Sequence, residues 1–143
     1  MPYRFREDIA PADVAFEAWG GTREELFTAC ATALLRTMVD DPERIERRQA
    51  VPFSLENEEL DLLLYAFLSE LVFYKDARRL LLHADSVIIE GQEGAFRLDA
   101  VAKGEEIDAQ RHRLLVDVKA VTLYRFRVVC EKDVWKATVV LDV

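Results

Sequence analysis

The chain contains few of the residues from which many enzyme sites are built. In 143 residues it has two histidines, two cysteines, five glycines and four prolines. His83 and His112 have no HxxxH or HExxH spacing, which argues against a histidine-rich metal site. Cys30 and Cys130 have no CxxC neighbour, so we expect two buried, reduced thiols rather than a disulfide, a zinc site or a catalytic nucleophile.

Several sequence signals of function are also missing. No GxGxxG, GxxxxGK[ST] or GxSxG pattern occurs, which argues against dinucleotide cofactors, phosphate loops and acyl transfer. A net charge of −8 repels phosphate backbones, so we expect no strong direct binding of nucleic acid and favour a protein partner or a cation. No apolar run approaches a membrane span and the N-terminus lacks the apolar core of a signal peptide. We therefore expect a cytoplasmic protein without membrane contact.

The spacing of apolar residues predicts an α+β fold. With 51% hydrophobic residues, we expect a single compact domain over residues 1–143, in which a mostly antiparallel or mixed sheet packs with two long helices. A capping box at Thr22-Arg23-Glu24-Glu25 begins a helix that should run to about Met38. A second helix should begin near Asn57-Glu58-Glu59, and Gly91-Gln92-Glu93-Gly94 is typical of a hairpin. Strands are expected over residues 3–5, 14–19, 51–55, 86–90, 95–103, 114–123, 125–131 and 135–143.

Acidic residues lie near both ends of the chain, each beside an expected strand. Asp13 directly precedes the strand over 14–19, and Asp142 lies next to the terminal carboxylate of Val143. If these strands are neighbours, the carboxylates meet, and an oxygen-rich cluster suits a hard divalent cation. The structural alternative is that Asp13 caps a turn and that the chain end is solvated.

Two further polar positions interrupt apolar segments. Lys119 lies within Val116-Asp117-Val118-Lys119-Ala120-Val121-Thr122, where alternation alone is equally compatible with a lysine that points to solvent. Gly104-Glu105-Glu106, taken by itself, is typical of an exposed turn. Neither segment identifies a site without further information.

Taken in order along nearly the whole chain, several segments resemble the archease family. The segments are Ala12-Asp13-Val14, Ala18-Trp19-Gly20, Thr22-Arg23-Glu24-Glu25-Leu26-Phe27, Met38-Val39-Asp40, Leu62-Leu63-Leu64-Tyr65-Ala66-Phe67-Leu68-Ser69-Glu70-Leu71, Gly104-Glu105-Glu106, Val118-Lys119-Ala120-Val121-Thr122-Leu123-Tyr124 and Leu141-Asp142-Val143. Each fragment is weak, but their order and combination are specific.

The resemblance implies a metal-binding accessory protein that is not itself an enzyme. It implies a partner, the GTP-dependent RNA-splicing ligase that joins tRNA halves, whose guanylylation and multiple turnover the family member promotes. By matching motifs, Asp13, Asp142 and the Val143 terminus are the implied metal ligands. Lys119, Glu106, Glu105 and Asp40 are the implied ligase-activation residues. The oxygen ligands suit Ca²⁺, Mg²⁺ or Mn²⁺ as the cofactor.

One departure from the family pattern lies beside Asp13. The usual His-Thr pair is replaced by Ala10-Pro11, which removes an imidazole that could orient or contact the site. Because the Asp13 carboxylate is retained, we expect metal binding to persist with altered geometry or affinity.

Two other classes of function stay open. A chaperone-like modulator of RNA-processing enzymes, such as an RNA methyltransferase, would use the acidic surface to keep a basic partner soluble or specific. A stand-alone metal-dependent hydrolase would need a water-activating constellation and a substrate pocket, and the shortage of histidines and clustered acids disfavours it.

Overall fold

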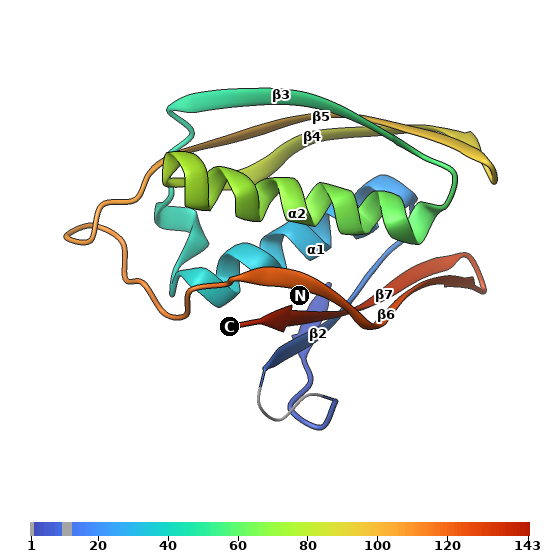
Figure 1. Ribbon diagram of the computed structural model, residues 1–143, viewed down its shortest axis with the longest axis horizontal. Coiled ribbons are helices and arrows are strands. Elements are labelled where there is room, and N and C mark those ends of the chain that lie inside the picture. The colour runs from blue at the N-terminus through green and yellow to red at the C-terminus, as the bar shows by residue number, and fades with distance from the viewer. Residues whose placement is uncertain (1, 10–12) are drawn as a thin grey trace.

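The computed structural model describes residues 2–9 and 13–143, which form two α-helices and seven strands (Figure 1). Ala10-Pro11, where the sequence departs from the family pattern, lies outside the described residues. The elements in chain order are β1 (Tyr3–Phe5), β2 (Val14–Gly20), α1 (Arg23–Met38), the 3₁₀ turn η1 (Pro42–Arg44), β3 (Gln49–Asn57), α2 (Leu60–Arg78), β4 (Leu80–Gln92), β5 (Ala95–Glu106), β6 (Ala120–Glu131) and β7 (Val134–Asp142).

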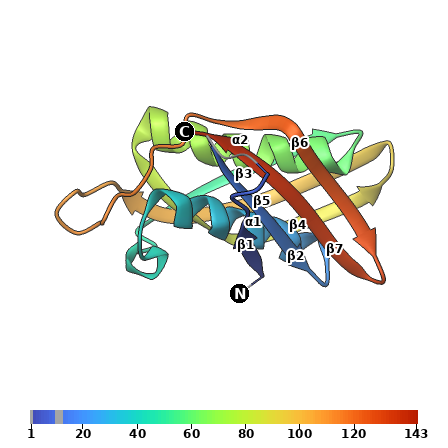
Figure 2. The same ribbon diagram turned by 90° about the horizontal axis from the view of Figure 1, so that it is seen from below.

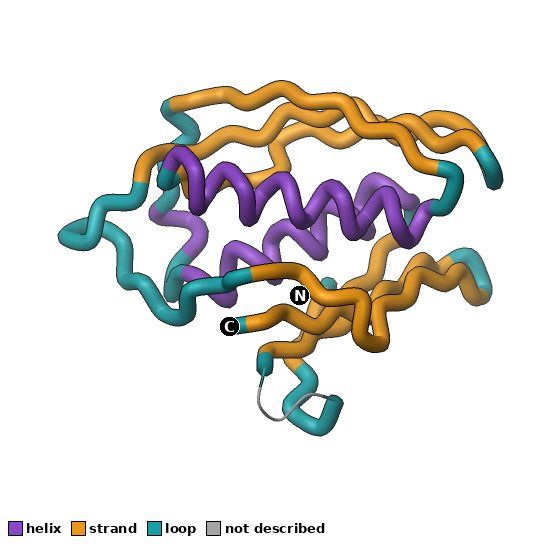
Figure 3. Tube along the Cα trace, viewed as in Figure 1, coloured by secondary structure: helices purple, strands orange, loops and turns teal. Residues whose placement is uncertain are grey.

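The strands divide between two antiparallel sheets with both helices between them, as Figure 3 shows. One sheet has the order β1-β2-β7-β6 and the other the order β3-β5-β4. This confirms the expected α+β class and adds a division that periodicity did not indicate. Because α1 and α2 each contact both sheets, the helices are apolar on more than one side.

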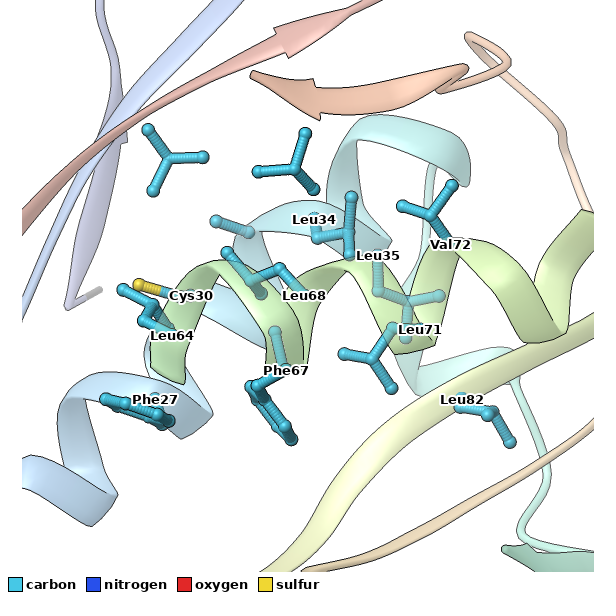
Figure 4. Packing of buried hydrophobic residues seen from close by; sticks show 14 of the residues in the cluster. Phe27, Cys30, Leu34, Leu35, Leu64, Phe67, Leu68, Leu71, Val72 and Leu82 are labelled. Atoms are coloured by element: carbon cyan, nitrogen blue, oxygen red, sulfur yellow. The ribbon is translucent and has the colours of Figure 1, made fainter. Parts of the chain in front are cut away.

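The core lies along the two helices (Figure 4). Phe27 of α1 and Phe67 of α2 are fully buried and their ring centroids lie 5.7 Å apart. Cys30 is buried in the same cluster, and burial raises the pKa of its thiol. Within the described residues, neither helix is long and apolar enough to cross a membrane.

Local signals place the first helix correctly. The Thr22 side chain accepts a hydrogen bond from the Glu25 backbone N–H, and the Glu25 carboxylate accepts from the Thr22 N–H, which confirms the capping box. A Cβ at Gly20 would lie 2.7 Å from the Leu26 backbone nitrogen. The chain can therefore turn sharply from β2 into α1 only because this residue is glycine.

Three sequence expectations are wrong. Residues 114–119 are not part of a strand, since β6 begins at Ala120. Gly104 and Glu105 are not an exposed turn, because both are buried at the end of β5, where Gly104 permits close approach of β4. Cys130 is exposed rather than buried, since β6 is an edge strand with one face to solvent, although both cysteines are free thiols as expected.

Candidate functional site

Asp13 and Asp142 come together at one end of the four-stranded sheet. Antiparallel β2 and β7 are neighbours, and their register pairs Val14 with Leu141. Asp13 and Asp142 lie immediately outside that pair, at the same end of the two strands. The expectation that these strands are adjacent is therefore confirmed, although the residues are 129 positions apart in the chain.

Strand alternation puts both carboxylates on the same face of the sheet. Ala15 pairs with Val140, and these two residues pack together outside the main core, with Ile9 against them. Side chains two residues apart share a face, so Asp13 lies on the face of Ala15 and Asp142 on that of Val140. Both aspartates are exposed. Within the described part of the chain, neither carboxylate forms a hydrogen bond or an ion pair.

The nearby cations of the β1–β2 region are occupied by other carboxylates. Arg6 binds both Asp8 and Glu17, and its hydrogen bond lowers the pKa of Asp8 to about 2. Arg4 also donates to Glu17, with its Nη2 2.9 Å from Oε1. These pairs neutralise the arginines of the β1–β2 region locally, while the two exposed aspartates keep their charge.

Lys119 joins the same end of the sheet through its backbone. Its N–H donates to the Asp142 carbonyl oxygen at 2.8 Å, and its side chain is exposed. It ends a connecting segment, residues 107–119, that joins the two sheets along the left edge of the molecule in Figure 1. The structure therefore brings the backbone of Lys119 beside Asp142, at the end of the sheet where Asp13 and Asp142 lie.

The connecting segment is irregular but firmly held. The backbone N–H groups of Leu115 and Val116 donate to the carbonyls of Met38 and Thr37, which satisfies the last turn of α1. Lys75 of α2 holds the two residues that precede Lys119. Its Nζ lies 2.6 Å from Asp117 Oδ1 and also donates to the Val118 carbonyl at 2.7 Å. Burial alone would lower the pKa of Lys75, but Asp117 and Asp76 outweigh it and raise the pKa.

Asp40 is paired with two arginines. It follows α1 and contacts Arg36 at 3.7 Å and Arg113 at 3.6 Å. A groove of about 700 Å³ contains both Arg36 and Asp13, with Phe5, Leu115 and Val116 among its lining residues. Asp40 is therefore paired with arginines, one of which also lines the groove that contains Asp13.

Glu105 belongs to a different, buried cluster. Its side chain is 6% exposed, accepts from the Glu46 backbone N–H at 2.6 Å, and binds Arg111 and His112. Burial alone would raise the pKa of this carboxyl, but these three donors outweigh burial and lower the pKa to about 2. His112 Nδ1 accepts from the Asp108 N–H, so Nε2 is the ring nitrogen that donates to Glu105. Glu105 thus holds the connecting segment to the η1 region.

Glu106 is exposed beside that cluster. It lines a polar groove of about 630 Å³ together with Arg48 and residues of the connecting segment. The two neighbouring glutamates therefore differ in kind, because Glu105 is saturated with donors and Glu106 faces solvent. Neither glutamate belongs to the end of the sheet where Asp13, Asp142 and Lys119 meet.

The donors at that end fit a hard cation. Two side-chain carboxylates on one face supply oxygen ligands of the kind that Ca²⁺, Mg²⁺ and Mn²⁺ prefer. Among residues 2–9 and 13–143, no three or more His, Cys, Asp or Glu side chains gather closely enough to hold a metal ion. A cation here would therefore need the chain terminus, backbone carbonyls or water to complete its shell.

Sequence reasoning missed the residues that hold these segments in place. Lys75 lies far along the chain from the adjacent pair Arg111 and His112, and no motif links them. Lys75 is the one with a usable signal, because it lies at helical spacing from Leu71 and Val72 on the buried side of α2. A lysine on an apolar face needs a partner, and here that partner is Asp117.

Comparisons with known proteins agree over the full length. A model of the archease protein family matches residues 3–143. Protein archease of Thermococcus gammatolerans is 38% identical over 117 residues, covering 82% of both chains. Protein archease of Methanopyrus kandleri is 32% identical over 142 residues, covering 99% of both.

Two solved structures share the fold. The solution structure of protein 1598 of Methanobacterium thermoautotrophicum has a TM-score of 0.84 and 31% identity, with 99% of both chains covered. The crystal structure of an archease from Thermotoga maritima, described as a possible chaperone, has a TM-score of 0.62 and 18% identity, with 92% of this chain and 91% of that chain covered. The second supports the fold alone.

Proposed function

This chain belongs to the archease family, and from that premise we propose that it activates the GTP-dependent RNA-splicing ligase. In this proposal it is a cytoplasmic, non-catalytic accessory protein that promotes guanylylation and multiple turnover of the ligase in tRNA splicing or RNA repair. The observation that carries the proposal is the meeting of Asp13, Asp142 and Lys119 at one end of the sheet. These are three of the positions that the family resemblance names.

The exposed aspartates are suited to act on a partner rather than on the fold. Asp13 and Asp142 share a face and form no ion pair among the described residues, so they can bind a cation that is shared with a second molecule. Asp13, Asp142 and the Val143 terminus would hold a divalent cation, which supplies positive charge to offset phosphate at a partner's active site. Lys119 adds a second positive charge at the same rim.

Rigid support of this end favours the same interpretation. The backbone of Lys119 is hydrogen-bonded to Asp142, and Lys75 holds the two residues before it. A site must hold its groups within a fraction of an ångström to contribute to a partner's chemistry. The irregular connecting segment meets that requirement because its backbone is bonded to α1, α2 and β7.

A guanylylation and multiple-turnover assay of the ligase from the same source tests the proposal. We expect the wild-type protein to stimulate both, and Asp142→Ala or Lys119→Ala to abolish stimulation without loss of the fold. Asp133→Asn is the matched control, because Asp133 immediately precedes β7 at the opposite end from Asp142. If Asp142→Ala and Lys119→Ala both stimulate the ligase as strongly as the wild type does, the assigned roles are refuted.

A chaperone-like function is the second candidate. The Thermotoga maritima structure that shares this fold is described as that of a possible chaperone. The net charge of −8 favours this candidate, because it suits a basic partner such as an RNA methyltransferase. This function predicts lower aggregation of the partner without any change in ligase chemistry. A ligase that is not stimulated, by a protein that binds divalent cations normally, would favour it.

A further inference from the structure

A third groove runs along the partly exposed side of α1. It encloses about 760 Å³, and α1, with 16 residues, is roughly 24 Å long at 1.5 Å per residue. Thr28, Ala29 and Thr32 form the middle of the groove, and Pro2 and Tyr3 line one side. The small central side chains leave room for a bound segment to lie against the helix.

Acidic residues lie at both ends of this α1 groove. Glu24 and Glu25 lie at the start of the helix, and Asp40, Asp41 and Glu43 lie beyond its end. Of the described lining residues Arg36 is the basic one, and it is 3.7 Å from Asp40.

The remaining acidic charges of the α1 groove are not matched by cations. Glu24 and Glu25 accept hydrogen bonds from neutral backbone N–H groups, and so does Asp41. In the described structure, Glu24, Glu25, Asp41 and Glu43 form no ion pair. A hydrogen bond to a neutral donor leaves the carboxylate charged, so the groove carries an uncompensated negative field.

We propose that the α1 groove binds a basic, arginine- or lysine-bearing segment of a protein partner. Five carboxylates against one guanidinium select for positive charge, and the two acidic ends favour a segment that lies lengthwise. About seven extended residues at roughly 3.4 Å each would span the helix. Trp19, which also lines the groove and is partly exposed, offers aromatic surface for a guanidinium to stack on.

The α1 groove adjoins the carboxylate end of the sheet but uses different residues. Arg36 lines both this groove and the one that contains Asp13, so a single partner could cover both. The proposal does not require that the partner be the ligase. It assigns affinity to the groove and leaves the chemistry to Asp13, Asp142 and Lys119.

Titration of the ¹⁵N-labelled full chain with blocked hexa-arginine, followed by NMR, tests the proposal. We expect amide shifts concentrated at residues 20–25, 28–32 and 40–43, and none with hexa-glutamate. Thr28→Arg, which adds a cation to the centre of the groove, should weaken hexa-arginine binding at least tenfold. Ala77→Arg adds the same charge to an exposed position of α2 outside the groove and should change it less than twofold.

A second variant keeps the test independent of folding effects at Thr28. Glu43 is exposed, so Glu43→Lys should weaken binding more than Glu93→Lys, which makes the same exchange in the β4–β5 hairpin. Equal losses in the groove and control variants, or shifts spread over all acidic faces, would mean non-specific attraction and overturn the proposal. Asp142→Asn should retain peptide binding, so failure of ligase stimulation and failure of the groove are distinguishable.

Discussion

The two acidic regions that the family resemblance names have opposite environments. Glu105 is buried and accepts hydrogen bonds from three donors, whereas Asp13 and Asp142 are exposed with no such partner among the described residues. A carboxylate whose lone pairs are filled by the protein stabilises the fold but has little capacity left for a ligand. Carboxylates at an open strand end have that capacity. The set of residues that the family resemblance names therefore combines residues with different tasks.

The largest effect on stability should come from adding a side chain at Gly104, the residue before Glu105. A Cβ at Gly104 would lie 1.7 Å from the Leu81 carbonyl oxygen, so Gly104→Ala must separate β4 from β5. We expect a loss of about 4 kcal/mol in the free energy of unfolding, measured by urea denaturation. Gly94→Ala is the control, since nothing lies within 4 Å of its Cβ position, and only its positive φ should cost about 1 kcal/mol. Equal losses in the two variants would contradict the steric explanation.

Removing the charge of Glu105 should be nearly as costly. Glu105→Gln leaves Arg111 and the Glu46 N–H without their anionic partner, and we expect a loss of about 3 kcal/mol. Glu106→Gln, one residue along the chain and exposed, should change the free energy of unfolding by less than about 0.5 kcal/mol. If the two variants are equally stable, the buried cluster does not hold the fold and the comparison fails.

The exposed aspartates should show the reverse behaviour. We expect Asp13→Asn and Asp142→Asn to unfold at wild-type denaturant concentrations when no cation is present. With Ca²⁺ or Mn²⁺ at a hundred times its dissociation constant, the wild type should gain about 2.7 kcal/mol and the variants should not. Thermal denaturation with and without the cation measures this gain in stability. If the cation stabilises Asp133→Asn as much as the wild type, the loss is specific to Asp13 and Asp142. Cation stabilisation retained in both tip variants would exclude the proposed ligands.

A smaller effect should appear as a pH dependence. Glu105 has its pKa lowered from 4.5 to about 2 in the folded chain, so its contribution is complete above pH 4.5 and lost as the pH falls toward 2. Between pH 6 and pH 3.5 the stability advantage of the wild type over Glu105→Gln should shrink by about 1 kcal/mol. An advantage that stays constant down to pH 3 would show that Glu105 is not the titrating group.

The parts of the fold that depend on neighbours in the chain were predictable. The capping box at Thr22, the hairpin turn near Gly94 and the end of α1 near Met38 follow from local hydrogen bonds and backbone preferences, and all are confirmed. The sequence predicts a strand in residues 114–119 because their apolar residues resemble those of a strand. In the structure, the N–H groups of Leu115 and Val116 instead satisfy the last turn of α1, and the Val118 carbonyl accepts from Lys75. No local sequence pattern reveals these hydrogen bonds.

The candidate site divides in the same way. The sequence by itself determined which carboxylates exist, that soft metal ligands are scarce, and that Asp13 and Asp142 each lie beside a strand. Only the tertiary structure decided that β2 and β7 are neighbours in register, that Lys119 reaches Asp142, and that Glu105 is buried while Glu106 is exposed. The physical reason is that strand pairing and burial depend on contacts between residues up to 129 positions apart, whereas propensity and spacing describe only the nearest turns of the chain.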